Sequence, residues 1–267
     1  MKTVLLIGAG GGIGRACAET LTKNGYRVLG VDRRGACAPD CAAFFDADVT
    51  SESGLAAAAA AIRTQTESLD AIVYAAGLYD MDSLIEIDEA RMQNIFDVNV
   101  FGAYRVNRAF FPLLTRGSRV VLVTSELAPL DPLPFTGLYG ITKTTLESYA
   151  FSLAMELQLI GISVSVIRPG AVETPLLGGS QKSIEAFTAR TSLYPGQAAR
   201  FLKVTRAVEA RSVPPEAVAQ RVLRALLAKR PRFLYSLNRN PLLRLLSFLP
   251  KRTQLFLIRR SLRGQAA

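Results

Sequence analysis

The chain has 267 residues and a formal net charge of +10, with 49% hydrophobic and 20% charged residues. This balance is typical of one large folded domain, and it excludes a disordered chain, a collagen and a small disulfide-rich scaffold. The sequence contains no histidine, which excludes serine–histidine–aspartate hydrolysis and a histidine proton shuttle, so acid–base chemistry must use Tyr, Lys, Asp, Glu or Cys.

Short apolar runs alternate with helical patterns along most of the chain. Most of these runs are apolar throughout, which is typical of parallel strands that are buried on both faces. The predicted strands cover residues 4–7, 27–32, 70–75, 119–124, 163–167 and 232–236, and the predicted helices cover 12–24, 55–66, 83–111, 139–159 and 214–229. The alternation predicts an α/β fold, a single doubly wound (Rossmann-like) parallel sheet with helices on both faces.

Two segments depart from this alternation. Residues 171–213 show no clear periodicity, and such a long irregular stretch in a compact domain is usually a lid or a substrate loop. Residues 237–267 follow the last predicted strand and form a basic extension. We therefore expect a catalytic domain over 1–236 that includes the lid, and a basic helical tail over 237–267.

A glycine-rich loop over residues 8–14 (GAGGGIG) joins the first predicted strand to the first predicted helix. Glycine permits positive φ and a close approach of the backbone to a pyrophosphate, and a helix N-terminus adds free N–H groups and partial positive charge. A glycine-rich string alone also fits a plain turn. The strand before it and the helix after it favour nucleotide binding.

Asp32 closes the second predicted strand, where such folds place a carboxylate on the ribose hydroxyls of the adenosine. The same carboxylate would repel a 2′-phosphate, so the sequence favours NAD over NADP. Arg33 and Arg34 follow directly and could pair with that phosphate, which leaves NADP open; they also fit solvated loop charges.

Tyr139 and Lys143 are four residues apart at the start of a predicted helix and therefore share one face. A phenol has a pKa of about 10, too high for a base near neutral pH, and a neighbouring ammonium lowers it. In a chain without histidine this pair is the best candidate for proton transfer, although the spacing also fits an ordinary surface pair.

Together these motifs resemble the short-chain dehydrogenase/reductase family in its single-domain form, over about residues 1–175. Further matching motifs are Asp48-Val49, Tyr74-Ala75-Ala76-Gly77, Asn99, Ser125 and Pro169-Gly170 with Thr174. The resemblance implies a catalytic set of Asn99, Ser125, Tyr139 and Lys143. It also implies a cofactor site formed by Gly8, Gly10, Gly12, Ile13, Gly14, Asp32, Arg33, Asp48, Val49, Ala75, Ala76, Gly77, Tyr139, Lys143, Pro169, Gly170, Val172 and Thr174.

The resemblance also implies a role for each catalytic residue. Tyr139 would be the general acid/base for hydride transfer to or from a carbonyl carbon, and Lys143 would hold the ribose hydroxyls and lower the tyrosine pKa. Ser125 would orient the substrate oxygen, and Asn99 would position a water in a proton relay. Thr174 would bind the nicotinamide amide or the pyrophosphate.

Two departures from the family pattern need a structural answer. Tyr74 and Ala75 replace two asparagines, so hydrogen bonds that brace the central strand are lost or remade. Ser125 lies fourteen residues before Tyr139, one more than is usual, so the proline-rich loop over 129–134 must absorb a residue. Thr124 is the alternative hydroxyl.

The positive charge is concentrated at the C-terminal end. Residues 217–267 carry 12 Lys and Arg and no Asp or Glu, whereas residues 1–216 carry 20 basic and 22 acidic residues. Residues 242–249 form an apolar arc if they are helical, with Arg244 and Ser247 opposite, and a second apolar cluster lies over 255–258. Such a tail can contact an anionic membrane surface, but it also fits a helix packed on the body or on a second subunit.

The expected function is NAD(P)-dependent hydride transfer between a nicotinamide and a secondary alcohol or ketone. The tail and the apolar residues of 171–213 favour a lipophilic, steroid- or retinol-like substrate. A 3-oxoacyl thioester reductase is one alternative, since a basic tail could attract an acidic carrier protein. A catalytically silent dinucleotide-binding protein that docks on membranes is another.

The remaining expectations concern partners and location. We expect no nucleic-acid partner, a homodimer or homotetramer, and a cytoplasmic location, at the inner face of a membrane if the tail binds lipid. We expect no metal, because Cys37 and Cys41 lack further ligands at metal spacing.

Overall fold

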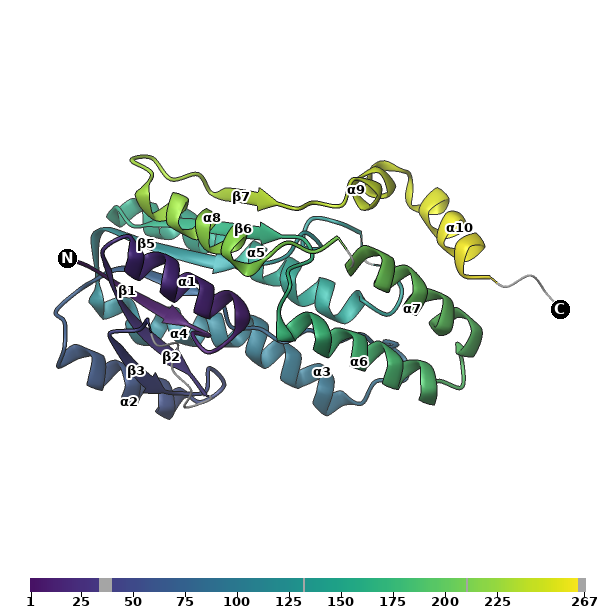
Figure 1. The fold of residues 1–267 in the computed structure, drawn as a ribbon, viewed down its shortest axis with the longest axis horizontal. Helices are drawn as coiled ribbons and strands as arrows, with labels where there is room; N and C mark the ends of the chain where they lie inside the picture. The colour runs from purple at the N-terminus through teal and green to yellow at the C-terminus, as the bar shows by residue number, and fades with distance from the viewer. Residues whose placement is uncertain (34–39, 132, 210, 264–267) are drawn as a thin grey trace.

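A computed structural model describes residues 1–33, 40–131, 133–209 and 211–263, so Arg34 and Cys37 lie outside the described residues. Within these residues, seven parallel strands form one sheet in the order β3-β2-β1-β4-β5-β6-β7 (Figure 1). The strands are β1 (Lys2–Ile7), β2 (Tyr26–Asp32), β3 (Ala43–Asp46), β4 (Leu69–Tyr74), β5 (Leu114–Val123), β6 (Ser163–Pro169) and β7 (Leu234–Leu237). The predicted doubly wound parallel sheet is confirmed.

Helices cover both faces of this sheet. They are α1 (Gly12–Lys23), α2 (Glu52–Arg63), α3 (Glu89–Phe96), α4 (Gly102–Phe110), α5 (Gly137–Leu157), α6 (Pro175–Arg190), α7 (Pro195–Glu209), α8 (Pro215–Leu227), α9 (Pro241–Phe248) and α10 (Lys251–Leu262), with a π-helical turn η1 (Asp97–Phe101) and 3-10 turns η2 (Phe111–Leu113) and η3 (Gln158–Ile160). Apolar residues of α2, α4 and α5 pack on one face, and those of α1 and α8 pack on the other.

The two cores explain why the strands are apolar throughout. Successive side chains on a strand point to opposite faces, so a strand covered on both sides needs apolar residues at every position. In β1, Leu5 and Ile7 join the core under α2, α4 and α5, whereas Val4 and Leu6 join the core under α1 and α8.

The prediction of an irregular lid over 171–213 was wrong in its secondary structure. The stretch forms α6 and α7, and each of these helices begins at a proline, which is favourable at the first helical position. The two helices pack on each other through a narrow apolar stripe that includes Ile184, Phe187, Ala198 and Phe201. Because so few residues are buried, the sequence of this pair is mostly polar and shows no clear helical period.

The connections of the sheet place the site. β1 pairs with β2 on one side and with β4 on the other, so β2 and β3 lie on one side of β1 and the later strands lie on its other side. In such sheets a crevice opens beyond the carboxyl ends of the strands at this switch point. The helices α6 and α7 lie beyond these ends (Figure 1).

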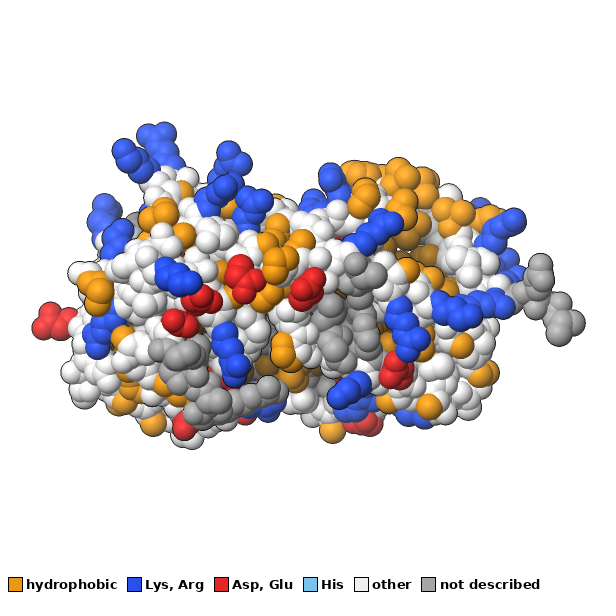
Figure 2. All heavy atoms as spheres, in the orientation of Figure 1, with side chains coloured by type: hydrophobic (Ala, Val, Ile, Leu, Met, Phe, Trp, Pro, Cys, Tyr) orange, Lys and Arg blue, Asp and Glu red, His pale blue; other side chains and the backbone are white. Residues whose placement is uncertain are grey.

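The tail forms α9 and α10, which also lie beyond the carboxyl ends of the strands, with α10 against α7 (Figure 1). The predicted helix over 242–249 therefore forms, and the Asn240 side chain caps it by accepting from the N–H groups of Leu242 and Leu243. The polar side predicted for this helix, with Arg244 and Ser247, is not fully exposed, because Ser247 is half-buried and its hydroxyl donates to the Leu243 carbonyl. Apolar side chains instead gather at the surface over α9 (Figure 2). Among the described residues, no helix is long and apolar enough to cross a bilayer.

Candidate active site

The glycine loop is shaped by two close backbone approaches. Gly8 directly follows β1 with a φ of +81°, and a Cβ at this position would lie 2.6 Å from the backbone nitrogen of Ala76. Gly14 lies in the first turn of α1, where a Cβ would lie 1.9 Å from the Gly8 carbonyl oxygen. Glycine is therefore required at both positions, and the N-terminus of α1 faces the crevice, as pyrophosphate binding needs.

Gly14→Ala is expected to lower the free energy of unfolding by about 1–3 kcal/mol and to weaken dinucleotide binding, because the loop must move away from α1. Gly196→Ala is the matched control, since a Cβ at Gly196 in α7 meets nothing within 4 Å. Urea unfolding of both variants checks this, and Gly14→Ala behaving like Gly196→Ala would contradict the tight packing.

The crevice is one cleft with two arms. The first arm is lined by the glycine loop, Asp32, Arg33, Asp48 and Val49. The second arm contains Ser125, Tyr139 and Lys143 in a largely apolar wall. The two arms share Ile13, Ala75, Ala76, Gly77, Tyr79, Thr174 and Leu176. With the exception of Asn99, every residue proposed for the cofactor or catalysis lines this cleft, including Gly8, Gly10, Gly12, Gly14, Pro169, Gly170 and Val172.

Acidic side chains are fixed in the first arm by backbone hydrogen bonds. The Asp32 carboxylate accepts from the Gly10 N–H at 2.9 Å and from the Arg33 N–H at 2.7 Å. The Asp48 carboxylate accepts from the Thr50 N–H at 2.9 Å and from its hydroxyl at 2.7 Å. Both carboxylates therefore keep a set position in the arm that would hold the adenosine half of a dinucleotide.

Tyr139 and Lys143 lie side by side at the start of α5, as predicted. The Tyr139 side chain is buried edge-on against the ring of Tyr79, with 4.3 Å between ring centroids, and the Ser125 hydroxyl forms a hydrogen bond with its phenol. The Lys143 Nζ is also buried, donates to the Val123 carbonyl at 3.3 Å, and lies 5.7 Å from the centre of the Tyr139 ring. The phenol, the amine and a hydroxyl thus meet in one wall of the cleft.

Burial dominates the titration of this pair. It raises the pKa of Tyr139 to about 12 although the Ser125 hydrogen bond lowers it, and it lowers the pKa of Lys143 to about 8. The groups that set the pKa of Tyr139 in the protein alone are its buried surroundings and Ser125, so the lowering of the phenol pKa by Lys143 stays a prediction.

The buried Lys143 should make the stability of the cofactor-free protein rise between about pH 8 and pH 9, above which the buried Cys17 thiol, with a pKa raised to about 12, opposes the rise. The pKa of Lys143 is about 8 when folded and 10.5 in a solvated lysine, so over this range the unfolded chain binds more protons and unfolding becomes harder as pH rises. Lys143→Met should remove this gain, whereas Lys229→Met at an exposed site should keep it. Urea unfolding at a series of pH values measures both; the same rise in Lys143→Met would contradict the buried amine.

Asn99 lies behind the cleft wall and not in it. It belongs to η1, is fully buried, and its amide group bonds both the N–H and the carbonyl of Leu78 and the Thr142 hydroxyl. π-Helical turns are frequent at functional sites, where they re-aim a side chain. Asn99 thereby holds the loop that follows Gly77 against α5, and its part in a water relay stays a prediction.

The departures from the family pattern are compensated locally. The Tyr74 hydroxyl donates to the Val98 carbonyl in η1 at 2.6 Å, so the side chain at this position again braces β4, whereas Ala75 contributes its main-chain N–H, which donates to the Ile7 carbonyl at 2.9 Å. The Thr124 hydroxyl turns away from the phenol and toward the Ile167 carbonyl, 3.3 Å away. Ser125, and not Thr124, therefore stands beside Tyr139.

The loop before Tyr139 contains a strained residue. Phe135 has a φ of +64°, which costs a residue with a side chain of order 1–3 kcal/mol and persists only where the surroundings hold it. Its ring packs against Phe187 of α6, Tyr194 of the turn that follows and Phe201 of α7, at centroid distances of 4.8, 5.4 and 5.5 Å. Its carbonyl accepts from the Asp82 N–H at 2.8 Å. The loop is thus locked to the helices that cover the cleft.

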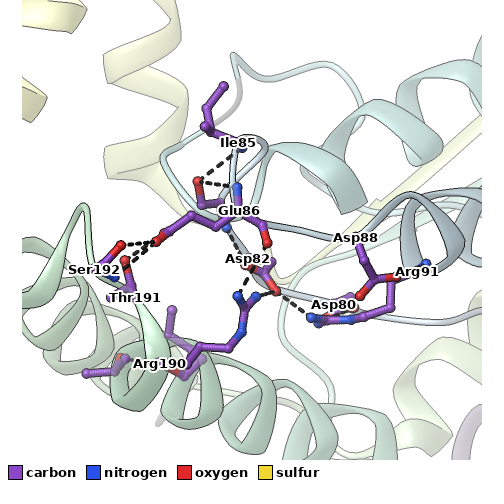
Figure 3. A network of polar contacts seen from close by, with 12 residues as sticks. Asp80, Asp82, Ile85, Glu86, Asp88, Arg91, Arg190, Thr191 and Ser192 are labelled. Carbon is purple, nitrogen blue, oxygen red and sulfur yellow. Dashed lines mark hydrogen bonds and ion pairs between the residues drawn. The ribbon is translucent and has the colours of Figure 1, made fainter.

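An ion-pair network holds the far end of the same helices (Figure 3). The buried Asp82 carboxylate pairs with Arg91 and with Arg190 at the end of α6, and Asp80 also pairs with Arg91. Glu86 accepts from the Thr191 hydroxyl at 2.6 Å, one of several groups of the turn between α6 and α7 that it bonds. The network therefore fixes this turn to the segment before α3 and keeps the outer wall of the cleft in place.

Several residues of the second arm carry no sequence signal of their own. Tyr79, Leu133, Val204 and Leu243 reach the cleft from four separate segments, and only the folded chain brings them together. Glu126 had a recognisable position, directly after Ser125 at the end of a predicted strand. Its buried carboxylate accepts from the Asn240 N–H at 2.6 Å, and burial raises its pKa.

Comparison with known proteins agrees with this geometry. A family profile described as short chain dehydrogenase matches residues 2–185. The chain is 30% identical over 249 residues to the uncharacterized oxidoreductase YbbO of Escherichia coli K12, covering 88% of this chain and 84% of that protein. It is 32% identical over 224 residues to human 17-beta-hydroxysteroid dehydrogenase type 1, covering 82% and 68%. A solved short-chain dehydrogenase from Streptomyces avermitilis has a TM-score of 0.73 and 26% identity over 89% of this chain and 88% of that chain.

The fold and the cleft define a nicotinamide-dependent oxidoreductase that acts on CH–OH groups. The chain belongs to the short-chain dehydrogenase family.

Proposed function

We propose that this enzyme transfers a hydride between NAD and a lipophilic secondary alcohol or ketone, with Tyr139 as the general acid/base. The observation that carries the proposal is that Tyr139 and Lys143 line the apolar arm directly beside residues that this arm shares with the glycine-loop arm, because Tyr139 packs on Tyr79 and Lys143 lies next to Gly77. The residues fit a dinucleotide, because the loop leaves no room for a Cβ at Gly8 or Gly14 and keeps the N-terminus of α1 open to the cleft.

Each group of the site has a part in this proposal. The glycine loop would hold the pyrophosphate, Asp32 the adenosine ribose and Lys143 the nicotinamide ribose; the bound cofactor supplies or accepts the hydride. Ser125 would hold the substrate oxygen next to the phenol of Tyr139. The buried phenol keeps its proton near neutral pH, since its pKa is about 12, and a protonated phenol is the form that can donate to a ketone oxygen.

The second arm supports a lipophilic substrate. Apart from the catalytic groups, its wall is mainly aliphatic and aromatic, with Leu127, Leu133, Leu176, Phe201, Val204 and Leu243. Such walls bind apolar ligands, and a few polar groups then fix the orientation. The human relative is named for a hydroxysteroid, which agrees with this substrate class.

Asp32 supports NAD as the cofactor, and the preference is testable. We expect NADH to bind at least about tenfold tighter than NADPH, because the carboxylate favours the ribose hydroxyls and repels a 2′-phosphate. Asp32→Ser should reduce the ratio of the affinity for NADH to the affinity for NADPH. Glu67→Ser, which removes one negative charge at an exposed site, should leave this ratio unchanged. Titration by nicotinamide fluorescence measures the ratio, and tighter NADPH binding by the wild type would reverse the assignment.

We also infer a cytoplasmic homodimer or homotetramer. Exposed large apolar residues on α5 and at the ends of α4, such as Phe101, Phe111, Phe151 and Met155, support a subunit contact there. Sedimentation of the purified chain tests the assembly, and a monomer at all concentrations would contradict it.

The function itself is tested by turnover. The wild type is mixed with NAD or NADH and a panel of hydrophobic alcohols and ketones, and the absorbance of the reduced nicotinamide is followed. Turnover that depends on Tyr139 supports the proposal; no turnover with any member of the panel would favour the catalytically silent alternative.

A further inference from the structure

The tail presents an apolar ridge to the outside. In α9, Leu242, Leu245 and Phe248 share one face and are 69%, 62% and 80% exposed. In α10, Leu255 and Phe256 are 70% and 54% exposed. Apolar side chains accordingly gather at the surface over α9 and α10 in Figure 2. A contiguous apolar surface of this kind marks a contact with another apolar phase.

The charged side chains of α9 and α10 are all positive. Arg244, Lys251, Arg252, Arg259, Arg260 and Arg263 lie on or next to α9 and α10, and residues 217–267 contain no acidic residue. Within the described part of the chain, the only ion pair of these six side chains is Lys251 with Asp131. Lys and Arg also stand along the same edge of the molecule, over the end of α8 and the segment before β7 (Figure 2). Apolar side chains among unpaired cations are typical of a segment that lies in an anionic membrane interface.

The ridge is fixed to the substrate arm of the cleft. Leu243, on the inner side of α9, lines this arm together with Phe201 and Val204 of α7. The start of α9 is held by the hydrogen bond from the Asn240 N–H to Glu126, the neighbour of Ser125. One helix therefore forms the wall of the apolar pocket with one side and the exposed ridge with the other.

The second tail helix is anchored as well. The Gln254 side chain donates to Asp131 at 2.6 Å, and Ile258 and Leu262 pack into the apolar cluster of α6 and α7. These inner residues recur every fourth position, so the outer side of α10 is left with Phe256, Arg260 and their neighbours. The helices that carry the ridge are therefore packed on the rest of the folded protein.

We propose that α9 and α10 dock on an anionic lipid surface, and that a lipid-dissolved substrate passes into the apolar arm of the cleft alongside α9. The docking rests on the ridge and its charges alone; the passage of substrate rests on the proposed function. A second copy of the chain is the weaker occupant, because a two-fold contact through this patch would bring two sets of unpaired cations together.

The first test is binding to vesicles. The full chain should float with vesicles of phosphatidylcholine and phosphatidylglycerol, and less with phosphatidylcholine alone. The triple variant Leu242→Asn/Leu245→Asn/Phe248→Asn should bind at least about tenfold more weakly, because it removes the side chains that enter the lipid. Arg244→Gln/Arg259→Gln/Arg260→Gln should lose the preference for phosphatidylglycerol.

A control variant and a control measurement accompany this test. Ile85→Asn/Leu193→Asn removes exposed apolar side chains outside the tail and should bind vesicles like the wild type. Sedimentation of the triple variant should show the wild-type assembly state. Unchanged vesicle binding by the triple variant, or a wild type that does not float, overturns the docking. The docking is also overturned if the triple variant loses vesicle binding only because its subunits dissociate.

The second test separates docking from catalysis. Turnover of a short water-soluble ketone should be the same in wild type and triple variant, whereas turnover of a ketone dissolved in the vesicles should fall at least about tenfold in the triple variant. Equal turnover of the vesicle-bound ketone overturns substrate passage. Vesicle binding without turnover of any ketone would leave the docking in place and overturn the proposed function.

Discussion

Tyr139→Phe is expected to lower kcat/KM for the alcohol or ketone by about 10²–10⁴-fold, which is the range that a positioned general acid or base contributes. The substitution removes one oxygen atom. The ring should still pack edge-on against Tyr79, so the fold and the cofactor arm of the cleft should be unchanged. We therefore expect the variant to bind NADH like the wild type and to fail only in turnover.

Tyr149→Phe is the matched control on the same helix. Its hydroxyl accepts from the Asn107 side chain at 3.0 Å and lies outside the cleft. This variant should keep wild-type turnover. Equal rates for Tyr139→Phe and Tyr149→Phe would show that the Tyr139 phenol is not the general acid/base.

Asp82→Ala is expected to lower the free energy of unfolding by about 2–4 kcal/mol. The carboxylate is 1% exposed and is the shared partner of Arg91 and Arg190, so its removal takes away the carboxylate partner of Arg190 and one of the two carboxylates that Arg91 binds. The turn between α6 and α7 should loosen, and the KM for a lipophilic substrate should rise because residues of these helices line the cleft.

The control for this change is Glu185→Ala, which breaks an ion pair with Arg206 on the surface of the same two helices. Both partners are about half exposed, and such pairs contribute roughly 0–1 kcal/mol. Urea unfolding followed by circular dichroism compares the two variants. A loss of stability in Asp82→Ala no larger than in Glu185→Ala would show that the network does not hold the wall.

The sheet could be predicted because its strands are buried on both faces. Val4, Leu5, Leu6 and Ile7 are all apolar for that reason, and the same holds in most of the other strands. The short edge strand β3 was missed, since four half-buried or exposed residues leave too little pattern. The helices α6 and α7 were missed because each buries only a narrow stripe, and the stripe is recognisable only when the partner helix is known.

The residues of the site also fall into two groups, those that could be predicted from the sequence and those that could not. The glycine loop, Asp32, Tyr139 and Lys143 could be predicted because each needs a particular residue type at a particular place on a strand end or a helix turn. Tyr79, Glu126 and Leu243 could not, because their function depends on neighbours that are distant in the sequence. The pKa of the phenol also escaped prediction, since the burial that raises it is a property of the folded chain.

The central claim is that this chain delivers a hydride to a carbonyl carbon. It is tested most directly by reducing a hydrophobic ketone with NADH that carries deuterium at the transferable position of nicotinamide C4, followed by mass and NMR analysis of the product. We predict an alcohol with one deuterium on the carbinol carbon in the wild type and almost no alcohol in Tyr139→Phe. An alcohol without deuterium, or equal amounts from both proteins, would contradict the claim.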